Sequence, residues 1–231
     1  MNEKKLALAD IDGTLYKGFM LLPFASFQKE EGLLNQTVFD QINLDVQRYK
    51  NKEWDYETFA EKVLIDWSRG LKGFSYSKTL DQAKLFLQGL GNVFYPETEG
   101  LIILLNRTHD IFFVTGEPQF LGQASCELFK IRGHISSEFE VDKDIFTGNI
   151  LRSLAKRGDK QKAVDHLIKE YPFRGSISFG DSPGDIEMLE STQYAVCVGQ
   201  NDVLMKYAQT KNWIIAQPEQ LIDVVKNITL C

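Results

Sequence analysis

The sequence predicts an α/β protein built on a doubly wound parallel sheet, with a helical subdomain inserted after the first strand. Two observations predict it. Short apolar runs alternate with amphipathic segments over most of the chain, as in α/β folds. Between about residues 17 and 94 this alternation stops, and helical patterns follow one another without a strand. We therefore expect residues 1–16 and 95–231 to form a Rossmann-like core and residues 17–94 to form the insertion.

Composition narrows the class of protein. The 231 residues are 43% hydrophobic and 25% charged, which is the usual balance of a soluble globular chain. The net charge of -6 offers no basic surface for nucleic acid or an anionic membrane, so we expect neither as a partner. The oligomeric state stays open. An apparent strand begins almost at once and leaves no room for a signal peptide, so we expect a cytoplasmic protein.

Four apolar runs have the character of strands that are covered on both faces of a parallel sheet. They are "KLALAD", "DIFFVTG", "SISFGD" and "YAVCVG". Helical spacing of apolar residues predicts helices over Pro118–Lys130, "GDKQKAVDHLIKEY" and "LIDVVKNI". The alternating segment Ile135–Ile150 predicts a hairpin with its turn around Asp142–Asp144.

The insertion contains two amphipathic patterns. One runs from Tyr56 to Trp67 and is rich in aromatic residues, and the other runs from Leu80 to Leu90 and closes at Gly89–Gly91. Large side chains suit the core of a small subdomain, so we expect most of this aromatic stripe to be buried. One or two of its members are expected to face a ligand.

The ends of three predicted strands carry polar or anion-binding groups. Asp10 and Asp12 close the first strand, Thr115 and Gly116 close the second, and Asp181 follows the third. Ligands of open parallel sheets bind beyond the carboxyl ends of the strands, so we expect these groups to converge at one edge. The sequence therefore predicts a polar site there.

The stretch "GDSPGDIEML" adds a further carboxylate to this site. If Pro183 begins a helix, Asp181 and Asp185 lie one helical turn apart. Four neighbouring carboxylates repel one another unless a cation lies among them, and hard oxygen ligands favour Mg²⁺. Lys160 shares a helix face with apolar residues, whereas Lys162 does not, so Lys160 is the lysine expected to point inward.

Four motifs together carry a family resemblance. "DIDGT" at 10–14, "FFVTG" at 112–116, Lys160 within "GDKQKAV", and "GDSPGD" at 180–185 resemble, in order, the motifs of the haloacid dehalogenase superfamily of phosphohydrolases. The helical insertion after the first motif resembles the C1-type cap of its phosphoserine-phosphatase-like branch. The likeness covers essentially the whole chain.

The resemblance implies a role for each motif residue. Asp10 would be the nucleophile that forms an aspartyl-phosphate, and Asp12 would act as general acid and base. Thr115 and the Gly116 N–H would bind phosphate oxygens at a helix N-terminus, and Lys160 would offset their charge. The implied Mg²⁺ ligands are Asp10, the Asp12 carbonyl, Asp181 and Asp185.

The family thus implies a Mg²⁺-dependent phosphatase of a small phosphorylated metabolite. Phosphoserine is disfavoured, because "YKGFM" has no acidic residue to meet an amine and Gly184 offers no side chain. Tyr16, Lys17 and Phe19 are the candidates for substrate specificity, since they lie nearest in sequence to the motif residues. Two alternatives stay open: a phosphotransferase of the same superfamily, and a phospho-acceptor signalling or binding domain without turnover.

Overall fold

A seven-stranded sheet forms the centre of the computed structural model, which describes residues 4–89 and 93–229. The strand order is β4-β3-β2-β1-β5-β6-β7, and every pair except β3–β4 is parallel. The strands are β1 (Lys5–Ala9), β2 (His109–Pro118), β3 (Gly133–Asp142), β4 (Ile145–Arg152), β5 (Ile177–Gly180), β6 (Tyr194–Val198) and β7 (Ile214–Ala216). The α/β fold class and the four predicted parallel strands are confirmed.

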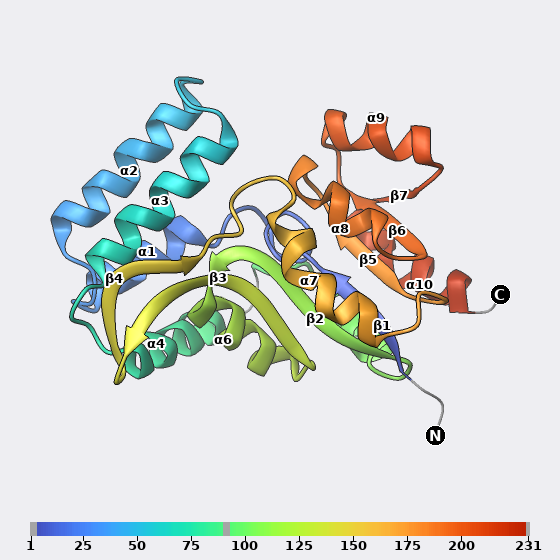
Figure 1. Cartoon of the computed structure of the whole chain (residues 1–231), viewed down its shortest axis with the longest axis horizontal. Helices are drawn as coiled ribbons and strands as arrows, with labels where there is room; N and C mark the ends of the chain where they lie inside the picture. The colour runs from blue at the N-terminus through green and yellow to red at the C-terminus, as the bar shows by residue number, and fades with distance from the viewer. Residues whose placement is uncertain (1–3, 90–92, 230–231) are drawn as a thin grey trace.

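Helices lie on both sides of this sheet (Figure 1). They are α1 (Leu21–Glu30), α2 (Gln36–Lys50), α3 (Tyr56–Gly70), α4 (Tyr76–Gly89), α5 (Thr98–Leu105), α6 (Gln119–Phe129), α7 (Asp159–Glu170), α8 (Ile186–Glu190), α9 (Asp202–Lys211) and α10 (Leu221–Thr229). Two 3₁₀ turns, η1 (Pro183–Asp185) and η2 (Pro218–Gln220), precede α8 and α10.

The first strand shows why both faces of the sheet are covered. Leu6 and Leu8 point to one face, where they pack with Val164 and Leu167 of α7. Ala7 and Ala9 point to the other face, into the main core that also contains side chains of α5, α6 and α10. Alternate residues of a strand point to opposite faces, so a strand with two apolar faces needs helices on each.

The predicted hairpin is present as β3 and β4. Asp142 pairs with Ile145 across a turn in which both Lys143 and Asp144 have positive φ angles, 47° and 72°. Two positive φ angles in a two-residue loop match the right-handed twist of the flanking strands. The hairpin extends the sheet toward the insertion, where Gly73 N–H donates to the Phe146 carbonyl at 2.9 Å.

Two helices of the insertion lie on the carboxyl-end side of the sheet, while another lies beneath it. In Figure 1, α2 and α3 form an upright pair at the left, and α4 lies alongside α6 below the sheet. The side chains of Asn35 and Asp55 cap α2 and α3 by accepting from Val38 N–H and Thr58 N–H, respectively. The described part of residues 17–94 contains helices and no strand.

The insertion leaves and rejoins the core through paired chain segments. Lys17 N–H donates to the Val93 carbonyl at 2.9 Å, and Tyr95 N–H donates to the Leu15 carbonyl at 2.9 Å. The division at residues 16/17 and 94/95 stays a prediction. Gly91, at which the second amphipathic pattern was expected to close, lies outside the described residues. None of the described helices has the length and apolar character needed to cross a membrane.

Candidate active site

Asp10 lies directly beyond the end of β1, at the centre of the sheet. Its N–H donates to the Phe179 carbonyl of β5 at 3.0 Å, and the residue is 5% exposed. Asp181 follows β5 and accepts from the Thr14 hydroxyl at 3.0 Å. Gly13, in the turn that follows Asp10, has a φ of +77°. A Cβ atom at this position would lie only 2.2 Å from the Asp181 Oδ2 atom. The glycine of "DIDGT" therefore allows both the turn and the approach of Asp181.

Lys160 lies between two of the predicted carboxylates. Its Nζ atom is 2.6 Å from Asp10 Oδ1 and 2.6 Å from Asp185 Oδ1, while the lysine itself is 8% exposed. The second oxygen of Asp185 accepts from the Ser182 N–H and hydroxyl, which closes the first turn of η1. By contrast, the Lys162 side chain is 75% exposed on the same helix, α7. We call Asp10, Asp181, Asp185 and Lys160 the acidic pole.

The acidic pole has the chemistry of a cation site. Oxygen atoms of Asp10, Asp181 and Asp185 lie within 4.8 Å of one another. Burial raises the pKa of Asp10 well above its usual range and that of Asp181 to about 6, with the charge of Asp185 adding to both. One lysine does not neutralise two buried carboxylates and a half-buried one. A hard divalent cation would offset the remaining charge, so these residues fit one.

Asp12 points away from this cluster, toward the start of α1. Its carboxylate accepts from the Met20 N–H at 3.2 Å. Glu117 lies beside it and is 6% exposed, and its buried Oε2 atom has no hydrogen-bond partner among the described residues. Burial raises the pKa of Asp12, and the neighbouring Glu117 raises it further. Glu117 was not among the predicted site residues, although it is a charged residue directly after Thr115 and Gly116.

Thr115 and Gly116 lie in a bulge of β2. The pairing of β2 with β3 shifts between Val114 and Pro118, so the segment between them leaves the regular ladder. Bulges redirect side chains and often occur beside active sites. The expectation that these residues lie at a helix N-terminus needs correction, because β2 continues to Pro118 and α6 begins only at Gln119. Their place at the carboxyl end of β2, beside the acidic pole, agrees with the sequence.

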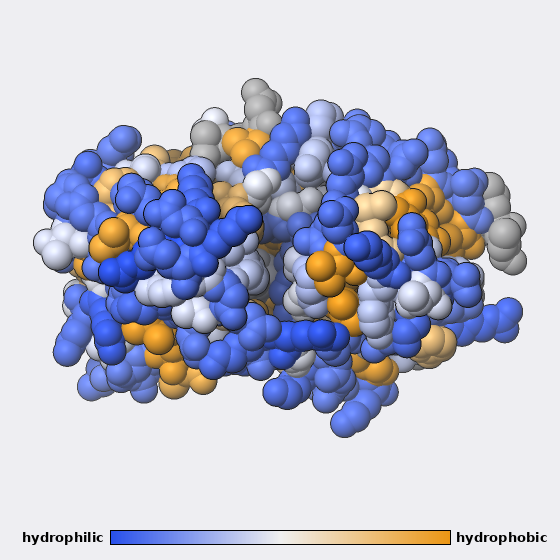
Figure 2. Space-filling view, turned by 90° about the horizontal axis from the view of Figure 1, so that it is seen from above, coloured by the Kyte–Doolittle hydropathy of each residue, from blue (hydrophilic) through white to orange (hydrophobic). Residues whose placement is uncertain are grey.

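One cavity of about 910 Å³ connects the acidic pole with the insertion. Asp10, Asp12, Thr115, Gly116 and Lys160 line one end. Side chains of α1, α2 and α3 line the other. Viewed from above, the surface is hollowed between the part that contains α2 and α3 and the part that contains α9 (Figure 2). The predicted site residues and the insertion thus share one cavity.

The far end of the cavity is lined by aromatic rings. Phe19 stacks on Tyr56 at 6.3 Å between ring centroids, Tyr56 lies 6.1 Å from Tyr49, and Tyr49 stacks on Phe59 at 4.8 Å. We call these four residues the aromatic wall. Phe19 is 52% and Tyr56 42% exposed, while Phe59 is 8% exposed. Tyr56 and Phe59 belong to the aromatic stripe that the sequence placed mostly in the core, and both line the cavity, Tyr56 with the larger exposed fraction.

The three proposed specificity residues have different surroundings. Phe19 lines the cavity. Tyr16 is 1% exposed and packs edge-on against Phe94, and burial raises the pKa of its phenol to about 12. The Lys17 ammonium lies 5.5 Å from the centroid of the Tyr95 ring. Contact with a ligand in the cavity is therefore direct for Phe19.

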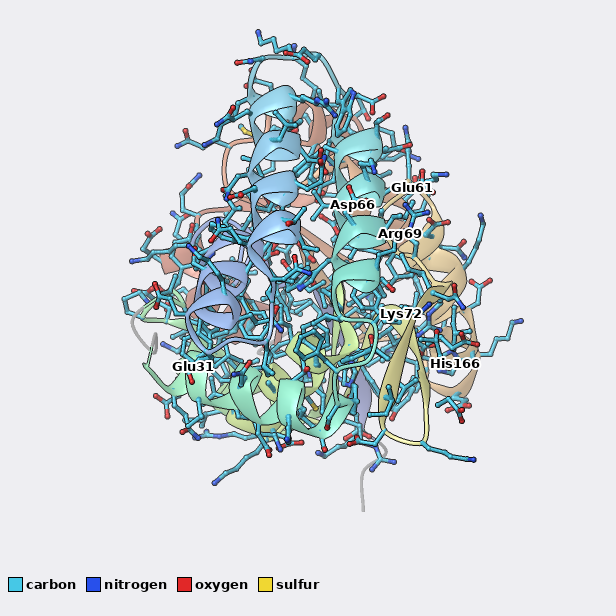
Figure 3. All side chains as sticks on the ribbon, turned by 90° about the vertical axis from the view of Figure 1, so that its left-hand side faces the viewer. Glu31, Glu61, Asp66, Arg69, Lys72 and His166 are labelled. Atoms are coloured by element: carbon cyan, nitrogen blue, oxygen red, sulfur yellow. The ribbon has the colours of Figure 1, made fainter. Side chains whose placement is uncertain are left out.

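Ion pairs join α3 to the loop that precedes α7. Glu61 projects from α3 toward the side on which α7 lies (Figure 3), and its carboxylate is 2.9 Å from the Lys156 ammonium. One residue further on, the Arg157 N–H donates to Glu57 at 3.2 Å, and its guanidinium pairs with Glu187 at 2.6 Å. These contacts connect the insertion to the core at the rim of the cavity.

Comparison with known proteins identifies the family. A model of the haloacid dehalogenase-like hydrolases matches residues 7–190, and the chain belongs to this family. No curated protein sequence matches the chain.

Several solved structures have the same fold at low sequence identity. A protein of unknown function from Bordetella pertussis Tohama I superposes with a TM-score of 0.76 at 18% identity, over 94% of this chain and all of its own. A phospho-aspartyl intermediate analogue of phosphoserine phosphatase superposes with a TM-score of 0.62 at 17% identity, over 94% of each chain. Cytosolic 5'-nucleotidase IIIB bound to cytidine gives 0.65 at 12% identity, over 97% of this chain and 86% of its own.

Proposed function

We propose that this protein is a Mg²⁺-dependent phosphatase that hydrolyses a small phosphorylated metabolite through an aspartyl-phosphate at Asp10. The observation that carries the proposal is the acidic pole itself, in which Lys160 Nζ lies 2.6 Å from both Asp10 and Asp185 beside a cavity that Asp10 and Lys160 line. Membership of a hydrolase family and the phosphoserine phosphatase fold support it. The insertion would act as the cap that closes over the substrate.

Each residue has a proposed task. An oxygen of Asp10 attacks phosphorus, the bond from phosphorus to the leaving oxygen breaks, and Asp12 gives that oxygen a proton. Asp12 then takes a proton from the water that attacks the same phosphorus, and the bond to Asp10 breaks. Thr115 and Gly116 bind the phosphoryl oxygens, and Lys160 balances their charge.

The metal site is proposed from the same residues. Asp10, Asp181 and Asp185, with the carbonyl of Asp12, would hold Mg²⁺. When bound, the ion would supply positive charge that stabilises the transferring phosphoryl group. The Asp12 side chain, which faces Met20 and Glu117, stays free for proton transfer.

Phosphate release from para-nitrophenyl phosphate tests the proposal. Activity should require Mg²⁺ and disappear with a chelator. Asp10→Asn keeps the shape of the side chain but removes the nucleophile, so kcat should fall by at least about a thousandfold. Asp223→Asn is the matched control, since that side chain is 76% exposed and lies on α10. Asp10→Asn activity equal to that of the control would refute the covalent route.

A second reaction, transfer of the phosphoryl group to an acceptor other than water, uses the same acidic pole. The cavity that reaches the pole is large enough to hold an acceptor. Phosphate release measured with and without added alcohols distinguishes hydrolysis from phosphoryl transfer. Loss of inorganic phosphate in favour of alkyl phosphate would identify a phosphotransferase.

A further inference from the structure

The cavity is larger than a phosphoryl group and a small polar leaving group need. Its volume of about 910 Å³ lies in the range of sites that hold whole organic ligands, ~300–1,000 Å³. The acidic pole occupies one end. Apolar side chains of the insertion line the opposite end, among them Leu22, Val46, Ala60, Val63 and Leu64. The space beyond the pole therefore favours an apolar ligand.

The aromatic wall adds a more specific preference. Phe19 and Tyr56 lie nearly parallel, with 28° between their ring planes, and both remain about half exposed although Phe59 behind them is buried. Exposed aromatic surface inside a cavity loses the free energy that burial would give. A flat ring placed against these two residues would recover it, because aromatic pairs favour stacked geometry.

Tyr56 connects the aromatic wall with the acidic pole. It occupies the first turn of α3, whose N-terminus Asp55 caps, and it lines the same cavity as Asp10 and Lys160. A group attached to phosphorus at Asp10 would thus share the cavity with this ring. The leaving group would therefore extend from the acidic pole toward the aromatic wall.

Some of the charged groups along the rest of the cavity have protein partners. Lys156 pairs with Glu61, and Arg157 pairs with Glu187. Asp55 caps α3, whereas the buried Glu117 Oε2 atom has no hydrogen-bond partner and Lys50 no ion pair among the described residues. Glu117 and Lys50 are thus available to charged groups of a ligand, so the preference for an apolar body rests on the apolar lining and the exposed rings.

We propose, resting on the phosphatase activity inferred above, that the natural substrate is a phosphomonoester whose leaving group is a large, mainly apolar body with a flat ring. Phe19 and Tyr56 determine this specificity by contact with the ring. The proposal differs from the amino acid substrate of the phosphoserine phosphatases that share the fold.

Binding of two non-hydrolysable probes tests this preference without turnover. Naphthylmethylphosphonate and methylphosphonate carry the same charged group and differ in the ring. By calorimetry with Mg²⁺, the protein should bind the ringed probe at least about tenfold more tightly. Equal affinity for the two probes would overturn the proposal.

Variants locate the preference on the wall. Phe19→Ala should lose about tenfold in affinity for the ringed probe and leave methylphosphonate binding unchanged. Tyr56→Leu, which retains apolar bulk, should show a smaller loss of the same kind. Phe173→Ala is the matched control, because Phe173 is 61% exposed and lies outside the cavity. Equal losses on both probes in Phe19→Ala would assign that residue a structural role and contradict the proposal.

Phosphate release from acetyl phosphate tests the phosphatase activity separately from the ring preference. Its leaving group has no ring to stack against the wall, so its turnover reports the pole alone. Release of phosphate together with equal binding of the two probes would leave the phosphatase standing and refute the ring preference. A ring preference that Phe19→Ala removes, without release of phosphate from any ester, would retain the aromatic site and refute the phosphatase.

Discussion

The two ends of the cavity are built in different ways. At the acidic pole, Asp10, Asp185 and Lys160 are buried and held by contacts of 2.6 Å. At the aromatic wall, Phe19 and Tyr56 are about half exposed and held by ring packing. Bond making requires atoms in fixed positions, whereas recognition of an apolar body requires a surface of the right shape. In the proposed phosphatase, the core would therefore carry out the chemistry and the insertion would determine specificity.

Asp12→Asn should have the largest effect among variants that spare the nucleophile. General acid–base catalysis contributes about a hundredfold to ten-thousandfold, so hydrolysis of alkyl phosphates should fall by this factor. The defect should shrink for para-nitrophenyl phosphate, whose leaving group needs little protonation. Steady-state kinetics over a series of leaving groups measures the trend. A uniform loss across the series would mean that Asp12 only holds other groups in place.

Substitution of the buried Lys160 should lower the thermal stability of the protein, whereas substitution of a lysine on the exposed face of α7 should not. Lys160→Ala leaves Asp10 and Asp185 without their cation, and breaking a buried ion pair costs about 3–5 kcal/mol. Thermal unfolding without Mg²⁺ should show a lower Tm for this variant. Lys162→Ala, on the exposed face, should unfold like the wild type. A similar Tm for both variants would argue against a stabilising role of the lysine at the pole.

Metal binding at the pole should depend on pH. The pKa of Asp181 is raised to about 6, so a proton competes with Mg²⁺ below that pH, and the Kd should rise about tenfold per pH unit for one displaced proton. The raised pKa also means that the metal-free fold loses stability as pH increases through 6. Added Mg²⁺ should therefore raise Tm more at pH 7 than at pH 5. An equal increase at both values would contradict a metal site at Asp181.

Substitutions at the rim of the cavity and at the start of the insertion should have the smallest effects on KM. Lys17→Ala and Glu61→Gln alter exposed groups, and exposed charge pairs contribute little to stability. We expect KM to change by no more than about twofold on an uncharged ring-bearing ester. A selective loss in Lys17→Ala on substrates with a second anionic group would instead assign recognition to that lysine.

The residues of the acidic pole were easier to predict from the sequence than those of the aromatic wall, and the reason is physical. Asp10, Asp12, Gly13 and Asp181 follow strands, and strand periodicity places strand ends at one edge of a parallel sheet. Lys160 was located because one helix face is apolar. The wall has no such local rule, since Phe19 and Tyr49 meet Tyr56 only through the packing of three different segments.

Two details of the site also depended on tertiary structure. The bulge at Thr115 and Gly116 appears only in the pairing of β2 with β3, so the sequence placed these residues at a helix start. Glu117 and Asp12 become neighbours only through the packing of two strands and the beginning of α1. Sequence periodicity contains no information on such pairs.

Phosphorylation of the protein by acetyl phosphate tests the division between pole and wall most directly. The Asp12→Asn protein, mixed with acetyl phosphate and Mg²⁺ and quenched in acid, should gain the mass of one phosphoryl group on the peptide that contains Asp10. The same mass should appear when Phe19→Ala is added to Asp12→Asn, and it should be absent when Asp10→Asn is added. A phosphoryl group on another residue, or its loss in the variant that lacks Phe19, would contradict the assignment of chemistry to the core.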